Sequence, residues 1–354
     1  MKPSRKIFIL CILIFAQCTN MLGVTFGSDV AVAVVATAQS IPTADATNQL
    51  LGFTSFVGGI TYANAATVCR YNNYFSIYGP ITLTNGLLNL NRNLTFGSNA
   101  TFPTGGQING NNFALNLPTR TTNFIIPAGT VMGNITLVVN SPLKLNSVLT
   151  FTNTCVIEGN GNVIDCSSGA LAVGASGTLM IQNATLQGVS NNRFYCYDNN
   201  GTVTLEGVTC QLNSTLTFSQ GRLEFLGENL FTGTQTFLFQ STRNSTIRSN
   251  ATWMFDSGMT FSYASTSNNL LQFDDITATL RLYETTLYAN TPGLNLTKGT
   301  VVLDGACPLI NDAFASANGI SIGDGVSAAN NLALTVLAES GITINRGFFV
   351  NNNV

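Results

Sequence analysis

The sequence contains no histidine and few charged residues of either sign. Asp, Glu, Lys and Arg make up 8% of the 354 residues, against about a quarter in typical soluble proteins. Without histidine the chain has no histidine metal ligand, no histidine general base and no Ser–His–Asp triad. Low charge combined with 45% hydrophobic residues argues against a disordered chain. The composition therefore indicates a folded protein and excludes several common catalytic designs.

Helix-forming sequence is equally scarce. Asn, Thr and Ser are abundant along the whole chain, and these types favour turns and strands over helices. No apolar run after residue 38 is long enough to cross a bilayer as a helix. Basic residues are single and widely spaced, whereas nucleic acid or an anionic membrane surface requires several on one face. We therefore expect no nucleic-acid partner and no transmembrane segment after the N-terminal leader.

The N-terminus resembles an export signal. A basic start at residues 2–6 precedes an apolar run at residues 7–15, and a small-residue cleavage site follows at residues 36–38. Such a run is too short to span a membrane and is typical of a signal peptide. We expect residues 1–38 to be a leader, with the cleavage site and lipidation left open. The predicted location is secreted, or on the cell surface or outer membrane.

A short alternating strand pattern recurs along the chain. Its clearest copies end in apolar residues at 181, 205, 225, 282 and 303, evenly spaced except for one gap nearly three times as long as the others. Phe239 and Phe261 stand near the places where two further copies would end inside that gap. A fixed period of roughly 20 residues is typical of repeat architectures. The copies are Gly177–Ile181, Gly201–Leu205, Gly221–Phe225, Ala278–Leu282 and Gly299–Leu303.

A second, longer repeat aligns residues 81–96 with residues 135–151. Both blocks begin Ile-Thr-Leu, contain a Leu-x-Leu-Asn core and end Leu-Thr-Phe. The offset between them predicts that the two blocks lie two or three turns of the shorter unit apart.

Strands of about five residues cannot bury an apolar face alone, but stacked repeats can share one interior. Leu, Ile, Val and Phe would then point inward, and Asn and Gly would form the corners because they tolerate left-handed backbone angles. We therefore predict an all-β, right-handed parallel β-helix of about 12 rungs over residues 75–354. Residues 39–74 fit the pattern less well and are predicted to be an N-terminal cap or linker.

The strand units and two segments, Ile157–Asp165 and Gly177–Leu186, resemble rungs of the pectin-lyase-like right-handed parallel β-helix superfamily. The resemblance covers roughly residues 75–350 and implies a fold used by enzymes that cut polysaccharides. Its hydrolase branch implies a Gly-His-Gly element, which a chain without histidine cannot contain. Its lyase branch implies clustered acidic calcium ligands with a basic proton acceptor.

The acidic residues do not form such a cluster in the sequence. Asp274 and Asp275 are adjacent, yet neighbours in a strand point to opposite faces. Glu158 and Asp165 flank a glycine-rich turn, and two carboxylates are few for calcium. Glu206 and Asp304 occupy the same place in the repeat unit, several turns apart. We assign no catalytic, metal or cofactor-binding residue. A divergent enzyme would need at least three acidic side chains converging on one long groove, with Arg222 or Arg281 as a further candidate beside them.

Cysteines and tyrosines leave alternatives open. The six cysteines after the leader could form disulfides or be buried as small apolar residues. The tyrosines could line a sugar-binding surface or pack at the edge of the coil. The cysteines are Cys69, Cys155, Cys166, Cys196, Cys210 and Cys307, and the tyrosines are Tyr71, Tyr74, Tyr78, Tyr195, Tyr197, Tyr263, Tyr283 and Tyr288.

From these observations we expect an exported, non-enzymatic, adhesin-like β-solenoid that binds a glycan or protein and needs no cofactor. Two alternatives remain: a divergent polysaccharide lyase or hydrolase, and a purely structural envelope protein.

Overall fold

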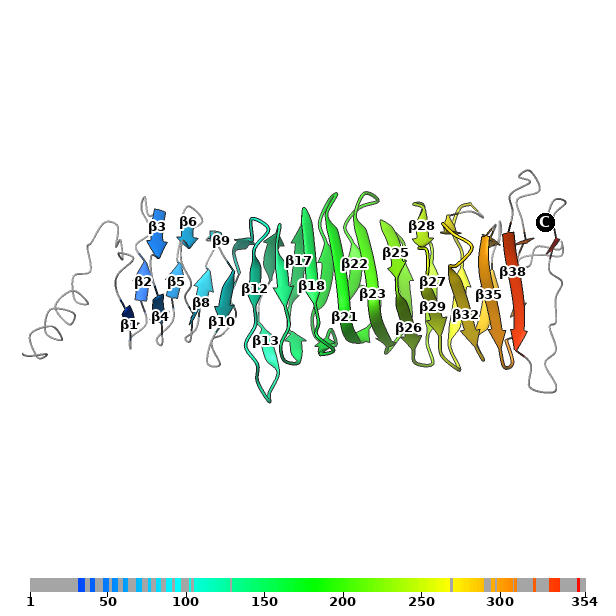
Figure 1. Cartoon of the computed structure of the whole chain (residues 1–354), viewed down its shortest axis with the longest axis horizontal. Coiled ribbons are helices and arrows are strands. Elements are labelled where there is room, and N and C mark those ends of the chain that lie inside the picture. Colours follow the sequence, from blue (N-terminus) through cyan, green and yellow to red (C-terminus); the bar gives the residue numbers. More distant parts are fainter. Residues whose placement is uncertain are drawn as a thin grey trace, which may run out of the picture.

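The structure is a computed structural model that describes residues 105–307, except 128, 268–269, 290–293 and 297, together with residues 93–96, Phe102 and separate strands outside these ranges. The described residues form β-strands and no helix, and they coil into a β-solenoid of about nine turns. Figure 1 shows the strands stacked as successive rungs of a rod. The predicted all-β parallel β-helix is confirmed. The prediction of about 12 rungs covered residues 75–354, part of which lies outside the described residues.

The strands pair in parallel from one turn to the next, in one long sheet and four shorter ones. The long sheet contains β1 (Ala31–Val35), β10 (Leu94–Phe96), β12 (Ala114–Asn116), β13 (Phe124–Ile126), β15 (Thr136–Val138), β16 (Leu143–Leu145), β18 (Thr154–Glu158), β19 (Val163–Asp165), β21 (Thr178–Val189), β23 (Thr202–Leu212), β25 (Arg222–Leu226), β26 (Glu228–Thr232), β28 (Ser245–Ile247), β29 (Thr252–Phe255), β31 (Leu271–Phe273), β32 (Thr279–Tyr283), β35 (Lys298–Asp304), β38 (Asn331–Leu337), β4 (Phe53–Phe56) and β7 (Ser76–Ile77).

The shorter sheets have eight, five, three and three strands. The eight-stranded sheet contains β3 (Thr47–Leu50), β6 (Val68–Tyr71), β9 (Leu87–Leu90), β11 (Gln107–Asn109), β14 (Thr130–Gly133), β17 (Val148–Thr152), β20 (Ala170–Val173) and β22 (Phe194–Cys196). The five-stranded sheet contains β24 (Leu216–Phe218), β27 (Thr236–Phe239), β30 (Thr260–Tyr263), β33 (Thr286–Ala289) and β36 (Leu309–Ile310). The others contain β2 (Gln39–Ile41), β5 (Ile60–Tyr62) and β8 (Ile81–Leu83), and β34 (Asn295–Leu296), β37 (Ser321–Ile322) and β39 (Phe349–Val350).

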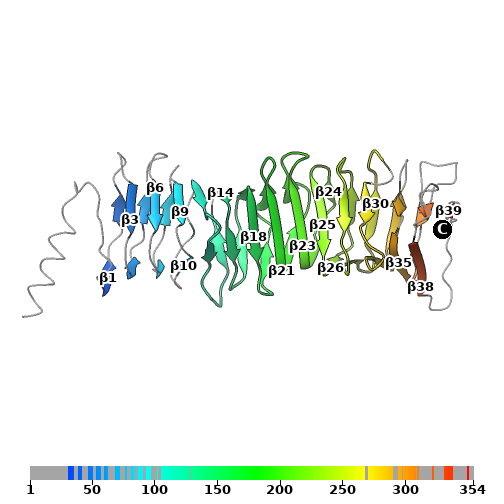
Figure 2. The same cartoon turned by 45° about the horizontal axis from the view of Figure 1, so that its top comes forward.

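One turn of the coil passes through three sides of the rod. β14 lies in the eight-stranded sheet, and β15 and β16 follow it in two different columns of the long sheet. The chain then returns to the eight-stranded sheet with β17. The longer strands β21 and β23 pair along both columns and so join two sides into one sheet. Strands of the eight- and five-stranded sheets, such as β14, β24 and β30, follow one another along a third side (Figure 2).

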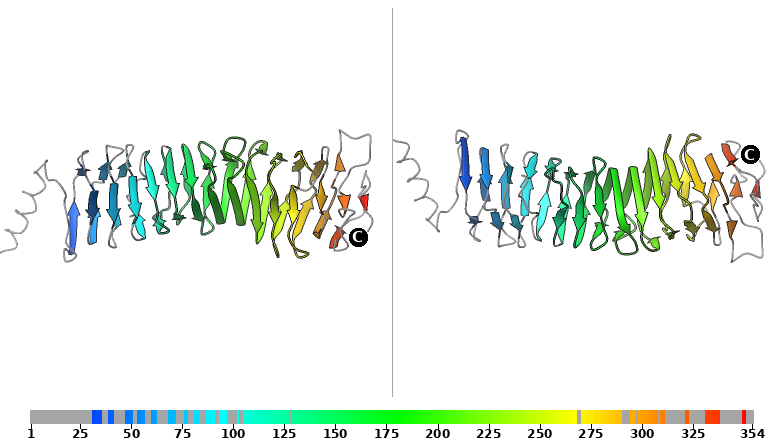
Figure 3. Two further views of the ribbon diagram at one scale, coloured as in Figure 1. Left: turned by 90° about the horizontal axis from the view of Figure 1, so that it is seen from above. Right: turned by 90° about the horizontal axis from the view of Figure 1, so that it is seen from below.

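The interior consists of apolar columns that run along the rod. In one column Leu115, Leu137 and Ile157 are partners on successive turns, and the column continues through Ile181, Leu205, Phe225, Ile247 and Phe273. These side chains are all buried. Each turn thus covers the apolar residues of its neighbours, which is how short strands acquire a core. Figure 3 shows the same stacking from two further sides.

The copies of the short strand unit belong to more than one column of the rod. Ile181, Leu205 and Phe225 form one column, but Leu282 and Leu303 belong to a second column that descends from Phe231 and Phe255. Phe239 and Phe261 lie on the third side, in β27 and β30. The long gap in the series therefore marks a change of column, because the same strand pattern serves more than one side of the rod.

The longer repeat was misplaced. Its block at residues 94–96 is β10 in the long sheet, whereas the matching residues 149–151 lie in β17 of the eight-stranded sheet. The two blocks are therefore not separated by a whole number of turns. The two blocks are similar because every strand of this coil has apolar residues at the alternate positions that point into the core.

Asparagine forms several corners between sides, as the sequence indicated. Asn134, Asn153 and Asn183 have positive φ values of 49°, 58° and 50°, a conformation that asparagine tolerates better than most residues. At the corner before Asn160, Gly159 leaves no room for a side chain, because a Cβ there would lie 2.5 Å from the Cβ of Ala184. Thr136 and Thr185 lie two residues after Asn134 and Asn183, in strands, so Asn-x-Thr is part of the corner design.

The predicted leader lies almost entirely outside the described residues, with only β1 placed, and its cleavage stays a prediction. β3 and β6 lie in the segment predicted as a cap or linker; β3 pairs in parallel with β6, and β6 pairs in parallel with β9. The division of the chain into leader, cap and β-helix also stays a prediction. Across the described residues, the structure contains no helix with the length and hydropathy needed to cross a membrane.

Candidate functional site

Charge is distributed unevenly over the sides of the rod. Ten charged residues lie within the strands from β11 to β36, and all ten belong to the long sheet. The strands of the eight- and five-stranded sheets in that range contain none. The ten are Lys144, Glu158, Asp165, Glu206, Arg222, Glu224, Glu228, Arg281, Lys298 and Asp304.

Many of the charges on the long sheet are engaged with residues of neighbouring turns. Arg248 lies between two carboxylates, 2.8 Å from Glu224 and 3.3 Å from Asp274. The hydrogen bond from Arg248 to Glu224 raises the pKa of the guanidinium. Glu206 accepts a hydrogen bond of 2.5 Å from the Gln182 amide one turn away. These contacts link rungs through partly exposed groups, so each is worth about 1 kcal/mol or less.

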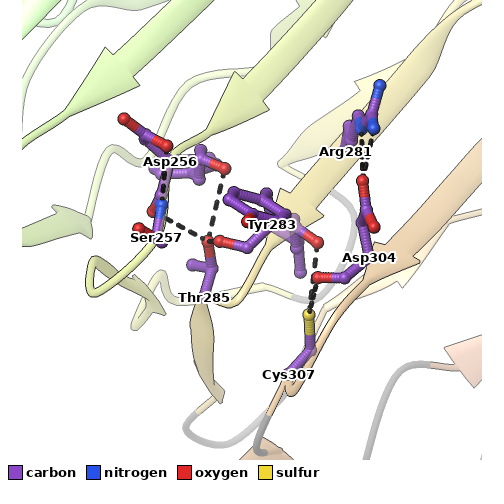
Figure 4. A network of polar contacts seen from close by, with 9 residues as sticks. Asp256, Ser257, Arg281, Tyr283, Thr285, Asp304 and Cys307 are labelled. Atoms are coloured by element: carbon purple, nitrogen blue, oxygen red, sulfur yellow. Dashed lines mark hydrogen bonds and ion pairs between the residues drawn. The ribbon is translucent and has the colours of Figure 1, made fainter. Parts of the chain in front are cut away.

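A second ion pair joins Arg281 to Asp304 on the following turn. Figure 4 shows it beside a corner where Thr285 Oγ1 lies 2.9 Å from the carbonyl oxygen of Tyr283. At the corner of the following turn, Cys307 Sγ lies 3.2 Å from the Leu282 carbonyl oxygen. Thr285 and Cys307 therefore satisfy free carbonyl groups at the corners, and this region uses its polar atoms to hold successive turns together.

The acidic residues considered as catalytic or calcium-binding candidates do not converge on one another. Asp274 pairs with Arg248, while Asp275 accepts hydrogen bonds from the backbone and hydroxyl of Thr277 in its own turn. Glu158 accepts from Asn160 and Asn183, and Asp165 accepts from the backbone of Ser167. Within the described residues, no three His, Cys, Asp or Glu side chains are grouped as metal ligands would be.

The eight-stranded sheet presents an outer surface of different chemistry, which we call the neutral face: the outward side chains of β11, β14, β17, β20 and β22, with the residues that directly follow these strands. The register places Gln107, Val131, Thr150, Ala172 and Tyr195 in one outward column. A parallel column runs through Asn109, Gly133 and Thr152. Gly174 and Tyr197, which directly follow β20 and β22, extend it through backbone hydrogen bonds to the carbonyl oxygens of Phe151 and Val173; Gly133, Gly174 and Ala172 are buried. Both columns consist of uncharged residues and cross five strands.

A depression of about 220 Å³ opens at one end of the neutral face. Its polar lining comes from the amides of Gln107, Asn109, Asn134 and Asn153 and the hydroxyl of Thr152. Gly133 contributes to its floor, where a Cβ would lie 3.0 Å from Thr152 Oγ1 and 3.3 Å from Asn153 Nδ2. We call it the amide depression. Because an amide group both donates and accepts hydrogen bonds, this lining suits a ligand that carries hydroxyl groups.

Two tyrosines stand at the other end of the neutral face. The rings of Tyr195 and Tyr197 meet edge to face with centroids 5.3 Å apart, and Tyr197 is 51% exposed. Burial, together with the neighbouring Tyr197, raises the pKa of Tyr195 to about 12, so this hydroxyl stays protonated at neutral pH. We call these residues the tyrosine pair. An exposed aromatic pair on an otherwise small and polar surface offers a flat apolar contact.

The other tyrosines have different roles. Tyr263 is fully buried and stacks on Phe239 with centroids 5.6 Å apart, so the packing interpretation is correct for this residue. Tyr283 is 42% exposed but is the last residue of β32, in the charged long sheet. Tyr288 is half-buried in β33. The side chains of Tyr71, Tyr74 and Tyr78 lie outside the described residues.

Five cysteines are buried and form no disulfide bond, so the interpretation as small apolar residues is confirmed for them: Cys155, Cys166, Cys196, Cys210 and Cys307. Burial raises the pKa of Cys166 and of Cys196 to about 12. Burial raises the pKa of Cys210 as well. Thiols in this state are protonated and unreactive. The side chain of Cys69 lies outside the described residues.

Comparison with known proteins adds no relative. No protein family, no curated protein and no solved structure matches this chain. Any assignment of function therefore depends on the geometry of this molecule.

Sequence reasoning named Tyr195 and Tyr197 among eight tyrosines but did not name any residue of the amide depression. Gln107, Asn109 and Thr152 become neighbours only once the register of β11, β14 and β17 is known. The sequence does contain one indication of this face: in each turn, one strand has no charged residue at its outward positions. That pattern can be recognised only after each strand has been assigned to a side of the rod.

Proposed function

We propose that this chain is an exported, non-enzymatic binding rod, adhesin-like in character, that recognises a glycan or a protein surface through its neutral face. We also propose that the chain is related to the pectin-lyase-like right-handed parallel β-helix superfamily, and that it is secreted or located on the cell surface. The parallel solenoid and the leader-like N-terminus support both.

One observation carries the proposal: the segregation of charge. Many charged groups of the long sheet are occupied by neighbouring turns, whereas the neutral face combines a hollow lined by amides with an exposed tyrosine pair. Amides and hydroxyls at an open depression and an exposed aromatic ring are the kinds of groups that bind a ligand. Two groups of the depression also bond within the fold: Asn109 to Asn111, and Thr152 to the Met132 carbonyl oxygen.

The test is binding to intact surfaces and to arrays of glycans and proteins, measured with the purified chain. The proposal predicts retained binding without chemical change of the ligand. Release of reducing ends or of unsaturated products from polysaccharides would instead establish the enzyme alternative. If the chain shows neither binding nor turnover, a structural envelope role is favoured.

A further inference from the structure

We propose that the ligand of the neutral face is an uncharged, linear oligosaccharide that lies along the rod axis, from the amide depression to the tyrosine pair. This inference rests on the proposed binding function and narrows it to one ligand class and one orientation.

The first argument is hydrogen-bonding chemistry. Sugar hydroxyls donate and accept, and so do the amides of Gln107, Asn109, Asn134 and Asn153 that line the depression. A lining of this kind matches hydroxyl groups without supplying a net charge for a carboxylate or a phosphate. An anionic ligand would instead require arginine or lysine side chains aimed at it.

The second argument is the aromatic surface. Tyr197 exposes half of its side chain, and its ring packs edge to face on Tyr195, which holds both rings in place. A pyranose ring has an apolar face of C–H groups that packs on such a ring. Ala172 and Gly174 lie between the tyrosine pair and Thr150 and Thr152; both are buried, so neither contributes to the surface that the ligand would meet.

The third argument is length. The face crosses four strand intervals from β11 to β22, which is about 19 Å at the usual spacing of paired strands. One sugar residue of an extended chain advances by a similar step, so a chain of about four or five residues covers the face. A ligand laid across the rod would meet only one or two of the strands.

The charged groups beside the face are held by the fold. Arg193 donates to the carbonyl oxygen of Gly169, and Asp198 accepts from the backbone N–H groups of Ser176, Asn200 and Gly201. The carboxylate of Asp198 is thus fixed next to Tyr197. Arg243, whose charge lowers the pKa of Asp198, donates to the carbonyl oxygen of Asn199 and the side chain of Asn200 and is likewise held by the fold.

The experiment is calorimetric titration of the full chain with cellopentaose, mannopentaose and xylopentaose, with pentagalacturonate as the acidic counterpart. At least one neutral pentasaccharide should bind, and at least tenfold more tightly than pentagalacturonate. Tyr197→Ala should weaken that binding at least tenfold. Tyr283→Ala, which removes a tyrosine of similar exposure in the long sheet, should leave it unchanged.

A second matched pair tests orientation. Gln107→Ala, at the far end of the face, should weaken binding of the pentasaccharide severalfold and leave binding of the corresponding disaccharide unchanged. Gln211→Ala, an exposed glutamine in β23 of the long sheet, should change neither. Thermal unfolding of each variant shows that the fold is retained.

The outcomes separate the two proposals. Stronger binding of pentagalacturonate, or equal effects of Tyr197→Ala and Tyr283→Ala, overturns the inference. If no oligosaccharide binds but the chain still adheres to cell surfaces or proteins, the carbohydrate inference fails and the binding rod stands. Absence of binding to every target defeats both.

Discussion

The long sheet and the neutral face consist of different strands of the same kind, yet their outer surfaces differ in chemistry. On the long sheet, Glu224, Arg248 and Asp274 form a chain of ion pairs across successive turns. On the neutral face, the outward positions are amides, hydroxyls, small residues, a valine and tyrosines. The core depends on the inward residues, so the outward residues of each side can differ. They can form bonds between turns on one side and contact a ligand on another.

The largest expected effect is on the charged side. Arg248→Glu replaces two attractions with two repulsions, and we expect the free energy of unfolding to fall by about 2 kcal/mol at low salt. Arg222→Glu is the control, because no described carboxylate lies within ion-pair distance of this exposed arginine, and it should change stability by less than about 0.5 kcal/mol. Denaturant unfolding measures both. Equal losses would mean that the ion pairs do not link the turns.

The second expected effect compares a positive charge introduced on the neutral face with one introduced on the long sheet. Thr150→Arg on β17 and Thr178→Arg on β21 alter outward, half-buried threonines. Each should change stability by less than about 0.5 kcal/mol. Thr150→Arg should nevertheless weaken ligand binding at least tenfold, and Thr178→Arg should not. A loss of binding in both variants would remove the distinction between the two faces.

Ionic strength sharpens the same contrast. At 1 M salt the screening length falls to about 3 Å, so the stability lost in Arg248→Glu should shrink to less than half its low-salt value. Binding of a neutral pentasaccharide should change less than about twofold over this range, because no charge pairing is involved. A steep salt dependence of binding would show that charged groups take part.

The smallest expected effect is a loss of stability at acid pH, to which one carboxylate beside each surface contributes. Desolvation raises the pKa of Asp198, but hydrogen bonds from Asn200, Ser176 and Gly201 and the charge of Arg243 outweigh it, so the pKa lies below the ordinary value of 3.8. Hydrogen bonds from Thr277 likewise lower the pKa of Asp275. Around and below the ordinary value the unfolded chain then binds more protons, and stability falls as pH falls through the folded-state pKa.

Asp198→Asn and Asp275→Asn should each flatten that decline slightly and to a similar degree, as followed by the unfolding midpoint from about pH 5 to pH 2. An unchanged slope in either variant would show that its carboxylate is not stabilised by the fold.

Composition and periodicity were sufficient to predict the parallel coil, because inward Leu, Ile and Phe and corner Asn follow from stacking itself. They could not separate the sides of the rod: Phe225 and Leu282 looked like members of one series, yet they lie in different columns. That separation depends on the length of each corner, which varies from a short link at Asn134 and Ile135 to a longer one at residues 159–162. The amide depression was missed for the same reason, since its residues come from three turns.

The central claim is that the uncharged side of the rod is the side that meets a ligand. Nitration of exposed tyrosines, read by mass spectrometry of the peptides, tests it directly when performed with and without the neutral pentasaccharide that binds best. Protection of Tyr197 with unchanged nitration of Tyr283 is the predicted result. Protection of Tyr283, or of neither tyrosine at saturating ligand, would contradict the account.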